Sequence, residues 1–306
     1  MRIADFPVSA ARASVAAALT EDRADGDVTT LWSVPADLVA TAEISTRRPG
    51  VVAGMPVVRE VFAQSAQSAQ SAQSAPEVGV EALVADGERV RAGDVLVRLT
   101  GSARSLITAE RTVLNFLQRL CGIATVTDAF VQAVAGTPAR ILDTRKTAPG
   151  LRALDKYAVT AGGGGNHRLT LAAMVLLKEN HITAAGGVTA AIDAVRKGMA
   201  DSGRSLPIDV EVQTVAQARE AMEAGAGWLM LDNMELADIE EVTRMRAGRR
   251  GGSKILLEAS GNLTLDGVRA IAEAGVDLIS IGSLTHSAPA LDLTMLITTD
   301  AAPCPR

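Results

Sequence analysis

The fold class follows from residues 208–233, IDVEVQTVAQAREAMEAGAGWLMLDN. Its two ends, IDVEVQ and WLMLDN, are short apolar runs with the length of buried strands. Between them, VAQAREAMEAG has the composition of an amphipathic helix and ends at a glycine. A strand, a helix and a second strand in this order predict two parallel neighbours in one sheet.

The same alternation continues on both sides of this stretch. Further strand-like runs are RILDTR (140–145), MVLLKEN (174–180), KILLEAS (254–260) and LISIGS (278–283), so six strands are expected. The later runs are separated by helical segments, VTAAIDAVRKGMA (188–200), ELADIEEVTRMRAG (235–248) and LDGVRAIAEAG (265–275). A repeat of roughly 20–30 residues predicts a (β/α) barrel, and a doubly wound sheet is the alternative on pattern alone.

Each predicted strand ends at a charged residue or a glycine. These positions are Arg145 and Lys146, Lys178, Glu211, Asp232, Glu258 and Gly282. In a barrel the carboxyl ends of all strands meet on one face, which holds the active site. The regular placement therefore favours a barrel with a convergent site, although any strand that leaves a core must also meet water.

The first part of the chain, residues 1–108, reads as a separate α/β domain. ARASVAAALTED (11–22) predicts a helix, and residues 40–54 and 80–101 contain β-type runs broken by glycine and aspartate. A three-residue repeat, AQSAQSAQSAQSA (63–75), is expected to be a surface insertion or an extension of the helix predicted for VVREVF. Residues 107–136 predict one long helix or a broken pair, with Gly122 as a break or a close-packing point. The barrel domain is assigned to residues 109–306.

Composition excludes several classes of protein. The 306 residues are 48% apolar with a net charge of −5, which indicates neither a nucleic-acid partner nor an anionic membrane. No signal peptide or membrane span is expected, and the two cysteines lack metal or redox spacing, so we expect a cytoplasmic protein. The basic patch RMRAGRRGGSK (244–254) would suit nucleic acid, but no aromatic residue interrupts it and a solvated loop is favoured.

Positive charge gathers in residues 140–181. Seven cations stand there against three acids, Asp143, Asp155 and Glu179; the cations are Arg140, Arg145, Lys146, Arg152, Lys156, Arg168 and Lys178. Apolar sequence between them brings some of these charges inward, where an unpaired charge is unfavourable. A bound small anion would relieve this, since Arg makes two-pronged contacts with carboxylate and phosphate. The alternative is a salt-bridge network with Glu211, Asp232 and Glu258.

Glycine-rich loops occur beside this segment and after the late strands. In TAGGGGNHR (160–168) the glycines allow close backbone approach and positive φ, so the loop can direct His167 and Arg168 at a pocket; a mobile tract is the alternative. Ser260–Gly261–Asn262 and Gly282–Ser283–Leu284 follow late strands, where barrels often bind phosphate. Glu211 and Asp232 before them suggest Mg²⁺ held partly through water, or simply a balance for the basic cluster.

These motifs together resemble the quinolinate phosphoribosyltransferase family. The stretches that carry the resemblance are ERTVLNFLQRLCGIAT, DTRKTAPGLRALDKYAV, GGGGNHR, LLKENH, LDNM, EASGN and GVDLISIGSLTHS, in the family's order. The resemblance implies an N-terminal α/β sandwich domain and an open (β/α) barrel, usually with seven strands. It also implies a homodimer or a higher oligomer, in which Arg111 reaches the partner's site.

The resemblance further implies a reaction and its residues: phosphoribosyl pyrophosphate and quinolinate give nicotinate mononucleotide, pyrophosphate and CO₂. Thr144, Arg145, Lys146, His167, Arg168 and Lys178 match the pocket for quinolinate and pyrophosphate. Glu211 and Asp232 match residues near the ribose and Mg²⁺, and these two with Lys146 and Lys178 are the expected catalytic set. Residues 260–262 and 282–284 match the loops for the 5′-phosphate. Thr170, Ala173 and Cys121 depart from the common family residues, and a related enzyme for another acid, such as nicotinate, stays open.

Overall fold

The computed structural model describes residues 2–68, 77–249 and 254–299. The chain divides into two compact units. The sandwich unit comprises Met1–Asp128, Thr147–Gly163 and Leu284–Arg306, and the barrel unit comprises Ala129–Lys146 and Gly164–Ser283. The predicted domain boundary between residues 108 and 109 falls inside helix α4 (Ala103–Ala133), and the division between the two units falls in the same helix, between Asp128 and Ala129.

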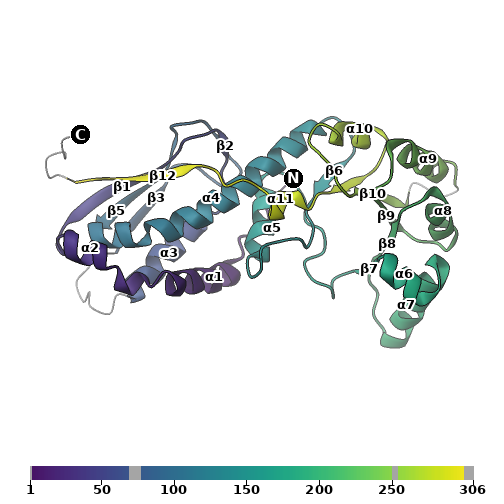
Figure 1. The fold of residues 1–306 in the computed structure, drawn as a ribbon, viewed down its shortest axis with the longest axis horizontal. Helices are drawn as coiled ribbons and strands as arrows, with labels where there is room; N and C mark the ends of the chain where they lie inside the picture. Colours follow the sequence, from purple (N-terminus) through teal and green to yellow (C-terminus); the bar gives the residue numbers. More distant parts are fainter. Residues whose placement is uncertain (1, 69–76, 250–253, 300–306) are drawn as a thin grey trace. The chain divides into compact units, whose positions relative to one another are not determined.

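The sandwich unit is built on a four-stranded antiparallel sheet in the order β12, β1, β5, β3 (Figure 1). These strands are Leu293–Thr298, Val39–Thr46, Val95–Ser102 and Gly79–Ala82. Along β1 the burial alternates, and Ala40, Ala42 and Ile44 form its buried face. This period of two gives a sheet with one face in the core. A small pair, β2 (Gly50–Val51) and β4 (Arg89–Val90), lies in the same unit.

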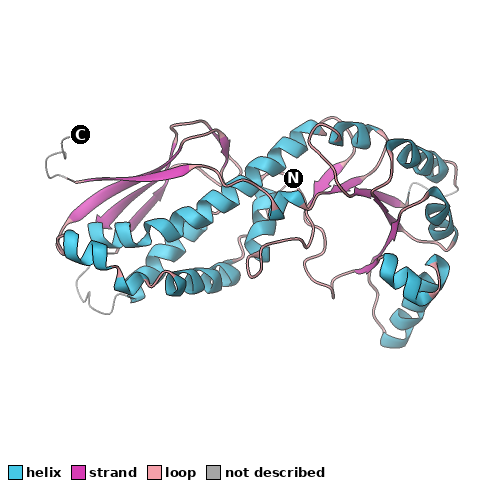
Figure 2. Ribbon diagram, in the orientation of Figure 1, coloured by secondary structure: helices cyan, strands magenta, loops and turns pink. Residues whose placement is uncertain are grey.

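Helices α1 (Val8–Glu21), α3 (Met55–Ser68) and α4 lie on one side of this sheet (Figure 2). Short helices η1 (Ala24–Gly26) and α2 (Val28–Ser33) follow α1, and α5 (Arg152–Ala161) belongs to the same unit. Residues 63–68 of the AQS repeat continue α3, and residues 69–75 lie outside the described part of the chain.

Helix α4 runs through Gly122 without a break. A Cβ atom at Gly122 would lie 2.1 Å from the backbone oxygen of Pro289, far inside contact distance. Of the two roles expected for this glycine, close packing is therefore the one that the fold uses. None of the described helices, α4 included, combines the length and apolar character needed to cross a membrane.

The barrel unit holds six described strands, all parallel, in the order β6, β11, β10, β9, β8, β7 (Figure 1). They are Arg140–Leu142, Leu278–Ser280, Leu256–Ser260, Trp228–Asp232, Ile208–Val212 and Val175–Leu177. The first strand in the chain pairs with the last, and the others follow in sequence. This cyclic order is that of a barrel, whereas a doubly wound sheet reverses direction at its centre. Because β6 and β7 are both edges, the barrel is open, as expected.

The two faces of this curved sheet differ in character. Helices α6 (Glu179–Ala185), α7 (Val188–Ser202), α8 (Val215–Glu223), α9 (Leu236–Ala247) and α10 (Val268–Glu273) surround its outer side (Figure 2). One set of alternating side chains is apolar and buried: Val210, Val212, Leu229, Leu231, Leu257 and Ile279. The other set contains Asp209, Glu211, Asp232, Glu258, Ser260 and Ser280. The apolar set packs under the helices, so the polar set lines the interior.

Candidate active site

The end of β6 provides the first part of the site. Asp143 is fully buried, and the Thr144 hydroxyl accepts a hydrogen bond from the Lys146 N–H at 3.0 Å. Lys146 is exposed, while Arg145 is partly buried and its Nε has no hydrogen-bond partner among the described residues. A buried guanidinium donor of this kind is suited to an anionic ligand.

The glycine tract brings the NHR segment beside β6. Gly165 forms a parallel bridge with Leu142, in which the Gly165 N–H donates to Ile141 O at 2.8 Å and Gly165 O accepts from Asp143 N–H at 3.0 Å. Gly163 has a φ of +84°, and a Cβ at Gly162 would lie 2.3 Å from Ala124 O within the sandwich unit. The glycines therefore serve close approach between backbones, and through it they place His167 and Arg168.

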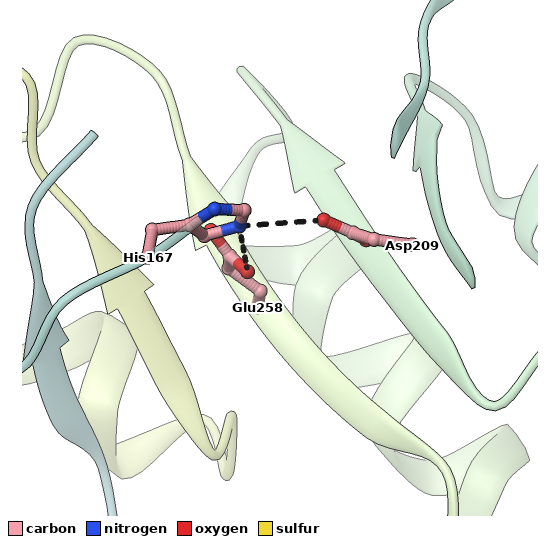
Figure 3. A group of neighbouring side chains, drawn as sticks. All are labelled: His167, Asp209 and Glu258. Atoms are coloured by element: carbon pink, nitrogen blue, oxygen red, sulfur yellow. Dashed lines mark ion pairs between the residues drawn. The ribbon is translucent and has the colours of Figure 1, made fainter. Parts of the chain in front are cut away.

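His167 lies inside the barrel, where its ring meets two buried carboxylates (Figure 3). Its Nε2 is 3.4 Å from Glu258 Oε2 and 3.6 Å from Asp209 Oδ2, and both acids are completely buried. These separations are long for hydrogen bonds and indicate an electrostatic contact. The Trp228 indole N–H donates to Glu258 Oε2 at 2.9 Å, and its ring packs at a tilt 5.7 Å from the His167 ring.

The pKa values of His167 and Asp209 in this cluster are both shifted from their usual values. Burial lowers the pKa of His167, but Asp209 and Glu258 outweigh it and raise the pKa to about 9. Burial also raises the pKa of Asp209, with Glu258 adding to the rise and His167 opposing it. Both changes favour keeping a proton within the cluster at neutral pH.

Arg168 follows His167 directly, and its guanidinium is anchored to the chain. Its Nη1 donates to Met174 O at 3.0 Å. Burial lowers the pKa of Arg168, and the nearby Arg145 lowers it further. A buried guanidinium beside a second cation is a place where an anion is stabilised.

Lys178 and Glu211 meet at the ends of β7 and β8, where the Lys178 ammonium donates to Glu211 Oε2. Glu211 is buried, whereas about half of the Lys178 side chain is exposed. Asp232 ends the next strand, and its Oδ2 accepts a hydrogen bond from Asn233 Nδ2 at 3.0 Å. The sequence left a salt-bridge network open as the alternative to an anion site, and one of its ion pairs, Lys178 with Glu211, is present.

Asn233 joins the two loops that follow β9 and β10. It has a φ of +52°, its N–H donates to Ser260 O at 2.9 Å, and its Oδ1 accepts from the Asn262 N–H at 3.2 Å. Gly261 has a φ of +129°, and a Cβ there would lie 2.4 Å from Asn233 Oδ1. Gly282 and Ser283 lie partly exposed at the end of β11, while Leu284 is completely buried.

Arg111 lies on α4 in the sandwich unit and is exposed. It lines a pocket of about 490 Å³ within that unit. The pocket is formed by helix α1, helix α4 and the turn that precedes α5, including Glu21, Asp22, Asn115, Arg119 and Pro149.

Two groups of the site were not predicted from the sequence. Asp209 stands two residues before Glu211 in β8 and shares its face, so the period of two was the available signal. For Asn233, the available signal in the sequence was that asparagine tolerates a left-handed backbone conformation better than most residues.

Known proteins match nearly the whole chain. The model of the quinolinate phosphoribosyl transferase N-terminal domain matches residues 27–121, and that of the C-terminal domain matches residues 123–296. The chloroplastic nicotinate-nucleotide pyrophosphorylase [carboxylating] of Oryza sativa subsp. japonica is 42% identical, over 95% of this chain and 78% of that protein. The protein of the same name from Mycobacterium leprae (strain TN) is 41% identical, over 95% of this chain and 98% of the relative.

A solved structure shows the same arrangement. The nicotinate-nucleotide pyrophosphorylase from Francisella tularensis superposes with a TM-score of 0.84 at 35% identity, covering 97% of this chain and 99% of its own. The family models, the relatives and the fold agree, and the chain belongs to the quinolinate phosphoribosyltransferase family.

Proposed function

We propose that this chain transfers the phosphoribosyl group of phosphoribosyl pyrophosphate to the nitrogen of quinolinate, with loss of CO₂, as a step of NAD biosynthesis. The observation that carries the proposal is family membership along nearly the entire chain, with basic and acidic groups at the carboxyl ends of parallel strands. That end of a barrel is where its active sites lie.

We propose that quinolinate binds against Arg145, Arg168 and Lys178. The Arg145 Nε has no hydrogen-bond partner in the described part of the chain, and Arg145 and Arg168 repel each other, so a dianion would stabilise both. Two carboxylates on neighbouring ring carbons, one of them next to the nitrogen, suit the planar forks of two guanidiniums. The same contacts would orient the nitrogen toward C1 of the ribose.

In the proposed reaction the quinolinate nitrogen forms a bond to C1 as the bond from C1 to the pyrophosphate oxygen breaks. Lys146 would neutralise the leaving pyrophosphate, and Glu211 and Asp232 would stabilise positive charge at the ribosyl centre. The bond from the ring to the adjacent carboxylate then breaks, CO₂ leaves, and the ring carbon takes a proton from water. The cationic pocket would favour this step where it holds the intermediate more tightly than the dianion.

We propose that Glu211 and Asp232 hold Mg²⁺, partly through water. The donor set fits, because both offer carboxylate oxygens from neighbouring strands, which is the ligand chemistry that Mg²⁺ prefers. Bound there, the ion would neutralise charge on the pyrophosphate. In the absence of the ion, Lys178 supplies the positive charge beside Glu211.

We propose that residues 260–262 and 282–284 bind the 5′-phosphate through backbone N–H groups. Asn233 supports this assignment, because its side chain fixes the loop of Gly261 and Asn262 from the neighbouring strand end. Backbone donors held in a fixed loop suit a phosphate without further ordering of the chain.

Gly261→Ala should raise the KM for phosphoribosyl pyrophosphate about tenfold, because the new Cβ would force Asn233 and the loop backbone apart. The KM for quinolinate should change far less. Gly203→Ala is the matched control, since Gly203 also has a positive φ but open space around it. Equal effects of the two substitutions on the KM for phosphoribosyl pyrophosphate would exclude the phosphate role of this loop.

We propose further that the enzyme is a cytoplasmic homodimer in which Arg111 completes the partner's site. The exposed Arg111 beside a pocket supports the dimer, since its guanidinium is available to a second copy. Cysteine usage supports the compartment: Cys121 is buried and reduced, and burial raises the pKa of its thiol to about 12.

A nucleic-acid role for residues 244–254 is disfavoured by the use of its cations within the chain. Arg246 donates to Asp277 and to Gly275 O, and Arg249 donates to Met222 O. Arg250 lies outside the described residues. No nucleic-acid or membrane partner is proposed.

Product analysis tests the proposed function. With quinolinate, phosphoribosyl pyrophosphate and Mg²⁺, we expect nicotinate mononucleotide and CO₂ in equal amounts, and no nucleotide product when nicotinate replaces quinolinate. Replacing Mg²⁺ with a chelator should suppress turnover. If the nucleotide forms from nicotinate but not from quinolinate, the chain is a related enzyme with another substrate.

A further inference from the structure

The cluster of Asp209, Glu258 and Trp228 around His167 has no role in the reaction described above. It lies inside the barrel, and both carboxylates are completely buried. Burying two acids in one cluster is unfavourable unless their surroundings are well arranged. Asp209 has no hydrogen bond to either oxygen among the described residues, so His167 is the group to which its charge is directed.

The hydrogen bonds of His167 fix its tautomer. Its Nδ1 accepts a hydrogen bond from the Arg168 N–H at 2.8 Å, so Nδ1 carries no proton. Asp209 and Glu258 raise the pKa of His167 and so favour a second ring proton, but a proton on Nδ1 would meet the Arg168 N–H head-on; this contact keeps the ring neutral, with one donor and one acceptor nitrogen. The ring proton is therefore on Nε2, which faces Glu258 and Asp209.

The position of the ring proton decides whether this cluster is a metal site or a histidine N–H held by two carboxylates. The ligating atoms of His167, Asp209 and Glu258 lie within 4.8 Å of one another, a spacing that a metal ion could occupy. A histidine binds a metal through an unprotonated nitrogen. Since Nε2 carries the proton, the atom that faces the carboxylates is a donor, and the geometry favours an N–H directed at two anions.

Both ring nitrogens of His167 are thus directed at the protein, and neither is left for a substrate carboxylate. The backbone is fixed as well, because the His167 N–H donates to the buried Asp143 Oδ1 at 2.8 Å. The next residue, Arg168, is the one that extends toward the site, and the His167 ring holds its backbone N–H.

We propose that Asp209 and Glu258 are positioning residues: they hold the Nε2–H of His167, and the ring in turn holds the backbone of Arg168 in place for quinolinate. In this role His167 positions Arg168 and is not the direct ligand expected from the family resemblance. The proposal rests on the proposed function, in which Arg168 binds the acid.

Kinetics of Asp209→Asn and Glu258→Gln test the positioning role, since each removes charge with little change in volume. We expect the KM for quinolinate to rise about tenfold in each, with the KM for phosphoribosyl pyrophosphate within about twofold of normal. Asp201→Asn, on the exposed face of α7, is the control and should change neither value. A purely structural role would lower stability and leave the quinolinate KM of the folded variant unchanged, which would overturn the proposal.

Nitrogen NMR of the unmodified enzyme tests the tautomer even if those variants do not fold. The chain has three histidines, so His181→Gln and His286→Gln assign the signals of His167. We expect a protonated Nε2 and an acceptor Nδ1, both unchanged when Zn²⁺ is added. A proton on Nδ1, or loss of the Nε2 proton on addition of Zn²⁺, would overturn the proposal in favour of a metal site.

The two proposals fail separately. If Arg145→Ala loses quinolinate turnover while Asp209→Asn and Glu258→Gln retain a normal KM, the site stands and the positioning role is wrong. If Arg145→Ala turns quinolinate over normally, the proposed site itself is wrong.

Discussion

Arg145→Ala should lower kcat/KM for quinolinate by roughly tenfold to a hundredfold. A hydrogen bond to a charged group contributes about 1.5–3 kcal/mol, and the Arg145 Nε, which has no partner among the residues that the structure describes, is a donor for the ligand that this variant would lose. Lys178→Ala should have at least as large an effect, because it also leaves Glu211 without the ammonium that it binds.

Steady-state kinetics of the purified variants, with circular dichroism to verify folding, measure this effect. Lys197→Ala is the matched control: it removes a cation from the same unit, but Lys197 lies exposed on α7 and pairs with Asp201. It should retain full activity. Near-normal turnover by both Arg145→Ala and Lys178→Ala would disprove the proposed quinolinate pocket.

Gly122→Ala should destabilise the sandwich unit by about 3 kcal/mol, at the upper end of the range for an overpacked site. The added Cβ would meet a backbone oxygen, Pro289 O, at 2.1 Å, and backbone cannot rotate away as a side chain can. For a unit of the size of the sandwich unit, the melting temperature should fall by roughly 6–12 °C.

Gly198→Ala should have the opposite effect on the free energy of unfolding, measured in the same experiment. Gly198 is in helix α7 with nothing within 4 Å of a new Cβ, so the substitution should stabilise by about 0.4–1 kcal/mol through helix propensity. Calorimetry of both variants measures the difference. Similar melting temperatures for the two would show that α4 does not pack against Pro289 as described.

Local pattern was sufficient to predict the barrel. The runs at 208–233 gave strand, helix and strand because buried parallel strands are short and apolar and the helix between them is amphipathic. Charged ends such as Glu211 and Asp232 could be assigned to one face because parallel strands all end there. The antiparallel pairing of β12 with β1 joins Thr41 to Thr298, 257 positions apart, and no local pattern carries that contact.

The site was predicted less completely, for physical reasons that differ between residues. Asp209 lies within an apolar run, and burial of a carboxylate there depends on His167, which arrives from a distant loop. The glycine tract was expected to allow close approach of the backbone, and Gly165 shows this by pairing with the end of β6. The direct contact of Arg145 and Lys146 with a substrate stays a prediction.

The sheet of the sandwich unit takes one of its edge strands, β12, from residues 293–298. During synthesis on the ribosome, the strands between residues 39 and 102 are therefore made long before their partner β12, which is translated after the whole barrel unit. Vectorial folding would complete the later unit first and leave the flank of β1 open until then. Premature termination before residue 293 would release chains with an uncovered edge, which makes nascent fragments of this protein natural clients for chaperones.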